Sequence, residues 1–104
     1  MEAREGFGMT GSARTSAGLD ERRRRLLYRA WHRGTREMDL IMGRFADAAI
    51  GELTEAEIVE LERLSEASDP ELYAWLTGAR PVPDAYNLTV FRRLREFHAL
   101  RPIE

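Results

Sequence analysis

The sequence has no cysteine and no lysine, and its only histidines are His32 and His98. Without cysteine the chain has no disulfide, no thiolate metal ligand and no cysteine nucleophile. The two histidines are far apart in sequence, and neither belongs to a metal-binding pattern such as His-x-x-x-His. Glycine-rich phosphate loops and nucleophile elbows are also missing. These absences indicate that the chain is not an enzyme in its own right and holds no metal ion.

Long apolar runs are missing as well. No run approaches the ~20 residues that a membrane-spanning helix needs, and the first residues lack the apolar core of a signal peptide. We therefore expect neither stable membrane insertion nor secretion. A net charge of -2 does not favour nucleic-acid binding either.

The first 18 residues are rich in glycine, serine, threonine and alanine and have no helical or strand period. We predict a disordered leader over residues 1–18 and one small domain over residues 19–104. A domain of that size buries a modest core but has no room for a catalytic cavity together with a cofactor-binding domain.

The remaining sequence reads as a succession of helices. Apolar residues recur at spacings of three and four, and no alternating strand pattern interrupts them. The start signals are Asp20, Thr35, Thr54 (with Glu57 completing a capping box), Asp69 before Pro70, and Asp84. The stop signals are Gly34, Gly51, Gly78 and Pro102. The sequence therefore predicts an all-α protein, a compact five-helix bundle with short connections.

Charge is distributed unevenly along the chain. Residues 1–45 carry ten arginines against six acids, whereas residues 46–71 carry nine acids against Arg63 alone. The two segments either neutralise each other within the fold or present one face to a partner. We interpret the run Arg22–Arg25 as a solvated turn rather than a phosphate-binding patch. The glutamates of the third predicted helix form a solubilising outer face: Glu55, Glu57, Glu60, Glu62 and Glu66.

The densest polar chemistry lies in residues 33–39, between the first two predicted helices. Arg33 has a planar guanidinium suited to bidentate contact with a carboxylate or carbonyl, and Gly34 lets another backbone come close. Glu37, near a helix start, is expected to stay ionised and accept hydrogen bonds. One interpretation is an intramolecular Arg–Glu pair that closes the turn. The other is a docking surface that presents a fixed carboxylate to a partner's active site.

The sequence Arg33-Gly34-x-x-Glu37 followed by Asp39 resembles the RGxxE signature of the FAD assembly factors of succinate dehydrogenase, the flavinylation factors. Residues 69–76 (DPELYAWL) resemble a second marker of that family, an acidic residue followed by an aliphatic–aromatic–x–Trp segment. The resemblance covers about residues 22–100. It implies a five-helix bundle, the architecture that the caps and apolar stripes also predict.

Family members bind the flavoprotein subunit of succinate dehydrogenase, and in some bacteria that of fumarate reductase, and promote covalent attachment of FAD to it. The resemblance implies that this chain acts on FAD carried by the partner. Because the sequence has no dinucleotide-binding fingerprint, we expect no tight binding of FAD by the chain itself. We expect a cytoplasmic bacterial protein that is monomeric when free. The contact residues that the resemblance implies are Arg33, Gly34 and Glu37, extended by Arg36 and Asp39. The fourth predicted helix is apolar on nearly every side, so it is either wedged between other helices or leaves Tyr73 or Trp75 exposed as a secondary partner surface.

Two other functions remain open at this point. A generic helical adaptor or antitoxin-like binder would use the acidic third helix and the aromatics of the fourth. A nucleic-acid binder would use Arg22–Arg25 and would show steeply salt-dependent retention, but the acidic net charge makes this the weakest hypothesis.

Overall fold

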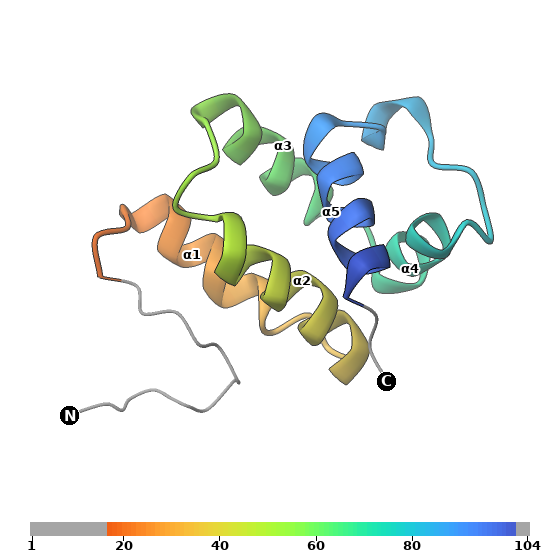
Figure 1. Cartoon of the computed structure of the whole chain (residues 1–104), viewed down its shortest axis with the longest axis horizontal. Helices are drawn as coiled ribbons and strands as arrows, with labels where there is room; N and C mark the ends of the chain where they lie inside the picture. Colours follow the sequence, from red (N-terminus) through yellow and green to blue (C-terminus); the bar gives the residue numbers. More distant parts are fainter. Residues whose placement is uncertain (1–16, 102–104) are drawn as a thin grey trace. The chain divides into compact units, whose positions relative to one another are not determined.

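The computed structural model describes residues 17–101, and within them every regular element is helical. The all-α class and the five α-helices are confirmed, with one short 3-10 helix, η1, in addition (Figure 1). The predicted leader falls mostly outside the described residues; only positions 17 and 18 are described, in a turn. None of the described helices is long and apolar enough to cross a membrane. The elements are α1 (Glu21–Ala30), α2 (Arg36–Ala49), α3 (Glu55–Leu64), α4 (Asp69–Thr77), η1 (Asp84–Tyr86) and α5 (Thr89–Leu100).

The chain divides into two units, with the boundary between Gly51 and Glu52. In the first unit, α1 and α2 pack against each other (Figure 1). Both helices begin at a side-chain cap, as predicted: an Asp20 carboxylate oxygen accepts from the Arg23 N–H at 2.8 Å, and Thr35 Oγ1 accepts from the Met38 N–H at 3.2 Å. The buried apolar side chains of this unit are Leu19, Leu26, Leu27, Ala30, Trp31, Met38, Ile41, Met42, Phe45, Ala46, Ala49 and Ile50.

The packing of α1 on α2 depends on a glycine inside α2. The indole of Trp31 lies directly over Gly43, so close that an added Cβ at Gly43 would fall 2.3 Å from a ring carbon. Trp31 is 5% exposed, and its Nε1 donates to a carboxylate oxygen of Asp47 at 3.1 Å. Trp31 thus fixes the end of α1 against the middle of α2, through one apolar and one polar contact.

Three arginines of the Arg22–Arg25 run are engaged within the first unit. Arg23 Nε donates to the Ile50 carbonyl at 3.1 Å, and Arg24 donates to the Leu19 carbonyl at 2.6 Å. Arg25 forms an i,i+4 ion pair with Glu21 at 3.3 Å. The Arg23 bond satisfies the carbonyl at the C-terminal cap of α2. Together the three contacts support the interpretation that the run is not a phosphate-binding patch.

In the second unit α3 packs against α5. The predicted capping box of α3 is present: Thr54 Oγ1 accepts from the Glu57 N–H at 3.1 Å, and Glu57 accepts from the Thr54 N–H at 2.9 Å. For α4 the predicted cap was wrong by one residue. Ser68 is the cap and forms a second capping box with Glu71, while Asp69 is the first helical residue. Serine accepts the N–H of Glu71, and the acidic side chain at Asp69 then favours the positive helix end.

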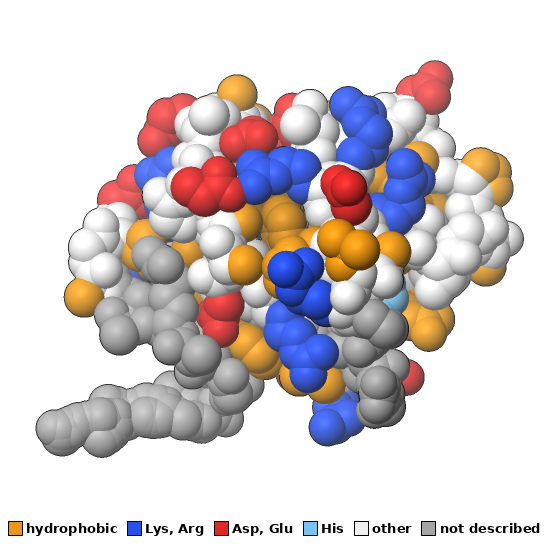
Figure 2. Space-filling view, in the orientation of Figure 1, with side chains coloured by type: hydrophobic (Ala, Val, Ile, Leu, Met, Phe, Trp, Pro, Cys, Tyr) orange, Lys and Arg blue, Asp and Glu red, His pale blue; other side chains and the backbone are white. Residues whose placement is uncertain are grey.

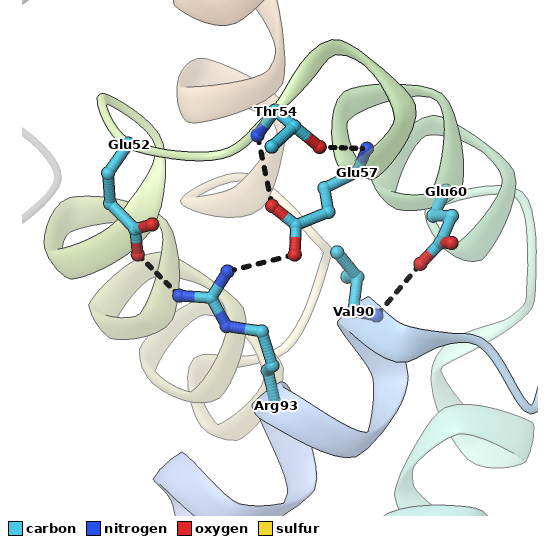
Figure 3. A network of polar contacts seen from close by, with 6 residues as sticks. All are labelled: Glu52, Thr54, Glu57, Glu60, Val90 and Arg93. Carbon is cyan, nitrogen blue, oxygen red and sulfur yellow. Dashed lines mark hydrogen bonds and ion pairs between the residues drawn. The ribbon is translucent and has the colours of Figure 1, made fainter.

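The start of α5 also differs from the prediction. Asp84 begins η1 rather than α5. Helix α5 starts at Thr89, and Leu88 at its N-cap position has no side chain that can accept a capping hydrogen bond. The missing cap is replaced from another helix, because Glu60 of α3 accepts a hydrogen bond from the Val90 N–H at 2.9 Å (Figure 3). A first-turn N–H of α5 is thus satisfied by a residue 30 positions earlier.

Arg93 of α5 joins two glutamates at the start of the second unit. Its guanidinium pairs with Glu57 at 3.2 Å and with Glu52 (Figure 3). Bonding to Glu52 raises the pKa of Arg93. The pKa of Glu57 is lowered, mainly by the Thr54 N–H and further by Arg93. The prediction of a wholly solvent-directed acidic face on α3 was therefore wrong for Glu57 and Glu60, which turn toward α5. Acidic and basic side chains also lie beside one another on the surface shown in Figure 2.

The lowered pKa of Glu57 predicts an acid-sensitive contribution to stability. A carboxylate whose folded pKa lies below its unfolded pKa stabilises the fold above the unfolded value and loses that effect as the pH falls through the folded value. We expect the unfolding free energy to fall between roughly pH 5 and pH 3, and to fall less in Glu57→Gln, which keeps a cap acceptor but has no charge to lose. Urea titrations of both proteins at several pH values measure this. Equal pH slopes would contradict it, and because Asp20 also has a lowered pKa, only the difference between the proteins reports Glu57.

Two of the three predicted glycine stops differ in detail. Gly78 follows α4 directly in the left-handed conformation, with φ 81°, as predicted. Gly34 has a positive φ of 125°, but α1 already ends at Ala30, so this glycine shapes the connection rather than the helix end. Gly51 has no positive φ, and α2 ends at Ala49 with Ile50 as its cap. Pro102 lies outside the described residues.

Candidate functional site

The connection between α1 and α2 carries the contact residues expected from the sequence, and we call residues 33–39 the corner. Thr35 caps α2 with its side chain, and its carbonyl accepts from the Asp39 N–H at 2.9 Å. Asp39 closes the other side: its carboxylate accepts a hydrogen bond from the Arg33 N–H at 2.5 Å. Gly34 lies between these bonds and takes the positive φ that the reversal of the chain requires. The corner is therefore held by bonds at both ends.

The corner presents its two outer charges to solvent. Arg36 and Glu37 are the first two residues of α2, and both are exposed. Glu37 lies in the first turn, where the exposed N–H groups favour an anionic side chain. Arg33 and Asp39 are half-buried, and Gly34 is exposed. The structure thus brings the five expected residues into one short segment, with Glu37, Arg36 and Gly34 accessible.

The corner is anchored to the core of the first unit on both sides. Trp31 precedes it by two residues and is fixed by Gly43 and Asp47. Met38, within it, is 2% exposed. Because a buried residue lies on each side, the exposed groups have little freedom to move relative to α1 and α2. Such a fixed segment presents its exposed groups in a defined arrangement.

One exposed feature next to the corner was missed from the sequence. The rings of Tyr28 and His32 stack with centroids 3.9 Å apart and planes inclined by 19°. Tyr28 is 62% exposed, and His32 Nδ1 lies 2.6 Å from the Tyr28 carbonyl oxygen. The i,i+4 spacing of two aromatic rings on a helix was the signal available in the sequence.

The secondary surface expected on α4 is only half available. Tyr73 is 44% exposed, but Trp75 is 6% exposed and packs against Tyr86 with ring centroids 5.1 Å apart. The guanidinium carbon of Arg63 lies over the Tyr86 ring, 5.1 Å from its centre. Trp75 therefore contributes to the core of the second unit, and of these two aromatic residues only Tyr73 is exposed.

Residues 17–101 contain no group of three or more histidine, aspartate or glutamate side chains placed to hold a metal ion. The chemistry that the corner offers is hydrogen bonding and ion pairing from a fixed backbone. A carboxylate, a guanidinium and an exposed glycine within five residues suit the recognition of polar groups on another protein.

Comparisons with known proteins agree with this description. A family model described as "Flavinator of succinate dehydrogenase" matches residues 24–98. The chain is 41% identical over 83 residues to the FAD assembly factor SdhE of Acetobacter pasteurianus, covering 80% of this chain and 76% of the relative. It is 35% identical over 88 residues to the mitochondrial succinate dehydrogenase assembly factor 2 of Kluyveromyces lactis, covering 81% of this chain and 54% of the relative.

The mitochondrial assembly factor 2 of Danio rerio is 31% identical over 93 residues, covering 88% of this chain and 59% of the relative. The chain thus spans about three quarters of the bacterial relative and little more than half of the two mitochondrial ones. The family match includes α2 to α4 in full and the entire corner. The chain belongs to the flavinator family of succinate dehydrogenase, a family of assembly factors rather than of catalytic enzymes.

Proposed function

We propose that the chain binds the flavoprotein subunit of succinate dehydrogenase through the corner and promotes the covalent attachment of FAD to that subunit. The observation that carries the proposal is the exposed Glu37 on a backbone fixed by Thr35 and Asp39. Arg33, Gly34 and Arg36 belong to the same contact. Family membership supports the identity of the partner.

The chain acts by positioning. It holds the flavoprotein in a conformation in which the flavin-accepting histidine and the flavin 8-methyl group lie close enough to react. Fixing two reacting groups in the right geometry lowers a barrier substantially without any proton transfer by the helper. A fixed carboxylate at Glu37 also suits a hydrogen bond that orients the partner's histidine. FAD stays with the flavoprotein throughout, so the chain needs no tight FAD site of its own.

Residues 19–104 act as one domain, and the free protein is a cytoplasmic monomer in a bacterium. Tyr73, exposed on α4, provides a secondary contact with the flavoprotein. The flavoprotein of fumarate reductase is a second client, as the resemblance to the family implies.

The direct test is reconstitution. Flavoprotein subunit made in cells lacking the chain is mixed with FAD, with and without the purified protein, and covalent flavin is read as in-gel fluorescence after denaturation. We expect the covalent flavin formed at early times to rise about tenfold or more when the chain is present. An unchanged yield at saturating concentration would overturn the proposal. The same assay with the fumarate reductase flavoprotein tests whether the chain also increases covalent flavin in that subunit.

A further inference from the structure

The start of α2 is built differently from the starts of α3 and α4. In α3 and α4 a Thr or Ser cap is joined by a glutamate at the third helical position, Glu57 or Glu71, which bonds back to the N–H of the cap. In α2 the third position is Met38, which is buried in the core and has no carboxylate. The reciprocal bond of a capping box is therefore impossible there.

Asp39, one position later, takes the place of the missing glutamate. Its carboxylate reaches past the cap and accepts the N–H of Arg33, two residues before Thr35, at 2.5 Å. Its own N–H is engaged with the Thr35 carbonyl at 2.9 Å. Asp39 is half-buried, so its side chain is directed at the connection rather than displayed on the surface as Glu37 is. The bond fixes the backbone on the N-terminal side of Gly34, where φ is 125°.

We propose that Asp39 is a positioning residue for flavinylation, which acts through the Arg33 N–H and does not contact the flavoprotein by its charge. The proposal rests on the proposed function and divides its five residues into two roles. Glu37 and Arg36 make the polar contact with the flavoprotein. Asp39 fixes the backbone of Arg33 and Gly34 in the position that this contact requires.

The two roles make opposite demands on the side chain. A hydrogen-bond acceptor for the Arg33 N–H needs only an oxygen at the right place, which the asparagine amide supplies. An ion pair with a partner needs the negative charge, which asparagine lacks. The bond to a neutral amide is weaker than one to a carboxylate, by about half, so a modest loss is still expected.

The experiment compares Asp39→Asn and Asp39→Ala with the unaltered chain in the reconstitution assay. We expect the initial rate of covalent flavin formation to stay within about threefold for Asp39→Asn and to fall about tenfold to a hundredfold for Asp39→Ala. In ¹H–¹⁵N spectra, the Arg33 amide resonance should stay downfield in Asp39→Asn and move upfield in Asp39→Ala. The bond predicts this because an amide proton is deshielded by a short contact with its acceptor.

A matched control separates positioning from stability. Glu57→Ala removes the equivalent carboxylate from the start of α3, which carries none of the proposed contact residues, and we expect a lower melting temperature with flavinylation kept within about twofold. If Asp39→Ala does not fold, the Asp39→Asn rate and its Arg33 amide shift still decide the question. A folded Asp39→Asn as inactive as Glu37→Ala would overturn the positioning role while leaving the proposed function intact. No stimulation by the unaltered chain would overturn the proposed function itself.

Discussion

Covalent flavin in the partner flavoprotein is expected to fall about tenfold to a hundredfold when Glu37 is replaced by alanine. Glu37 is exposed at the second position of α2, in the part of the chain where Thr35 and Asp39 fix the backbone. The truncation removes one carboxylate and leaves those bonds in place. The expected cost to stability is only the loss of a favourable charge near the helix start, about 0.3–1 kcal/mol.

The control for Glu37→Ala is Glu96→Ala, which removes an exposed glutamate from α5. Glu96→Ala should leave flavinylation unchanged, and both variants should show helical circular dichroism and melting temperatures close to those of the unaltered chain. Gly34→Arg adds an independent block, because arginine adds bulk at an exposed site and is strained at a φ of 125°. Full flavinylation activity of Glu37→Ala would show that the Glu37 carboxylate is not part of the contact with the flavoprotein.

Gly43→Ala is expected to destabilise the first unit by roughly 2–4 kcal/mol. The new methyl group would lie 2.3–2.6 Å from three carbons of the Trp31 ring, and because Trp31 is 5% exposed, the ring or the backbone of α2 would have to shift within a packed core. Alanine favours helix over glycine by about 1 kcal/mol, which offsets part of the loss. Displacing the ring also strains the 3.1 Å bond from Trp31 to Asp47. Urea unfolding followed by circular dichroism measures the change.

Two further variants identify the cause of that loss. Ala48→Gly, at an exposed position of α2, measures the helix propensity term in the same helix and should cost about 1 kcal/mol. Combining Gly43→Ala with Trp31→Leu should cost less than the sum of the two single changes, because leucine leaves space for the methyl group. A Gly43→Ala protein as stable as the parent, or additive effects in the double variant, would show that the indole does not press on Gly43.

Helix starts that depend on a local side-chain cap were largely predictable from the sequence. Thr35 and Thr54 cap α2 and α3 as expected, because a cap joins groups only two or three residues apart. The error at α4 has the same local origin. Ser68 and Asp69 are both good cap residues, and the capping-box spacing from Ser68 to Glu71 was the sequence signal that favours Ser68. The composition of the corner was also readable, since its residues are consecutive.

Features that join distant residues were not predictable. The predicted start of α5 was wrong because the Val90 N–H in its first turn is satisfied by Glu60 of α3. No sequence signal near Thr89 indicates this distant bond. Trp75 and Tyr73 are two residues apart and both aromatic, but only the position of Tyr86 determines that Trp75 is buried. The role of Asp39 likewise depended on the direction of its carboxylate.

The sequence by itself determined the helical class, the approximate extent of α1 to α4, and the RGxxE corner with its family resemblance. These follow from apolar periodicity, caps and consecutive residues, all of which act over a few positions. Only the tertiary structure showed that the Trp31 ring packs directly on Gly43. It also showed that the Asp39 carboxylate bonds within the connection, whereas Glu37 is exposed to solvent. The physical reason is that side-chain direction and close packing depend on partners that the chain brings together only on folding.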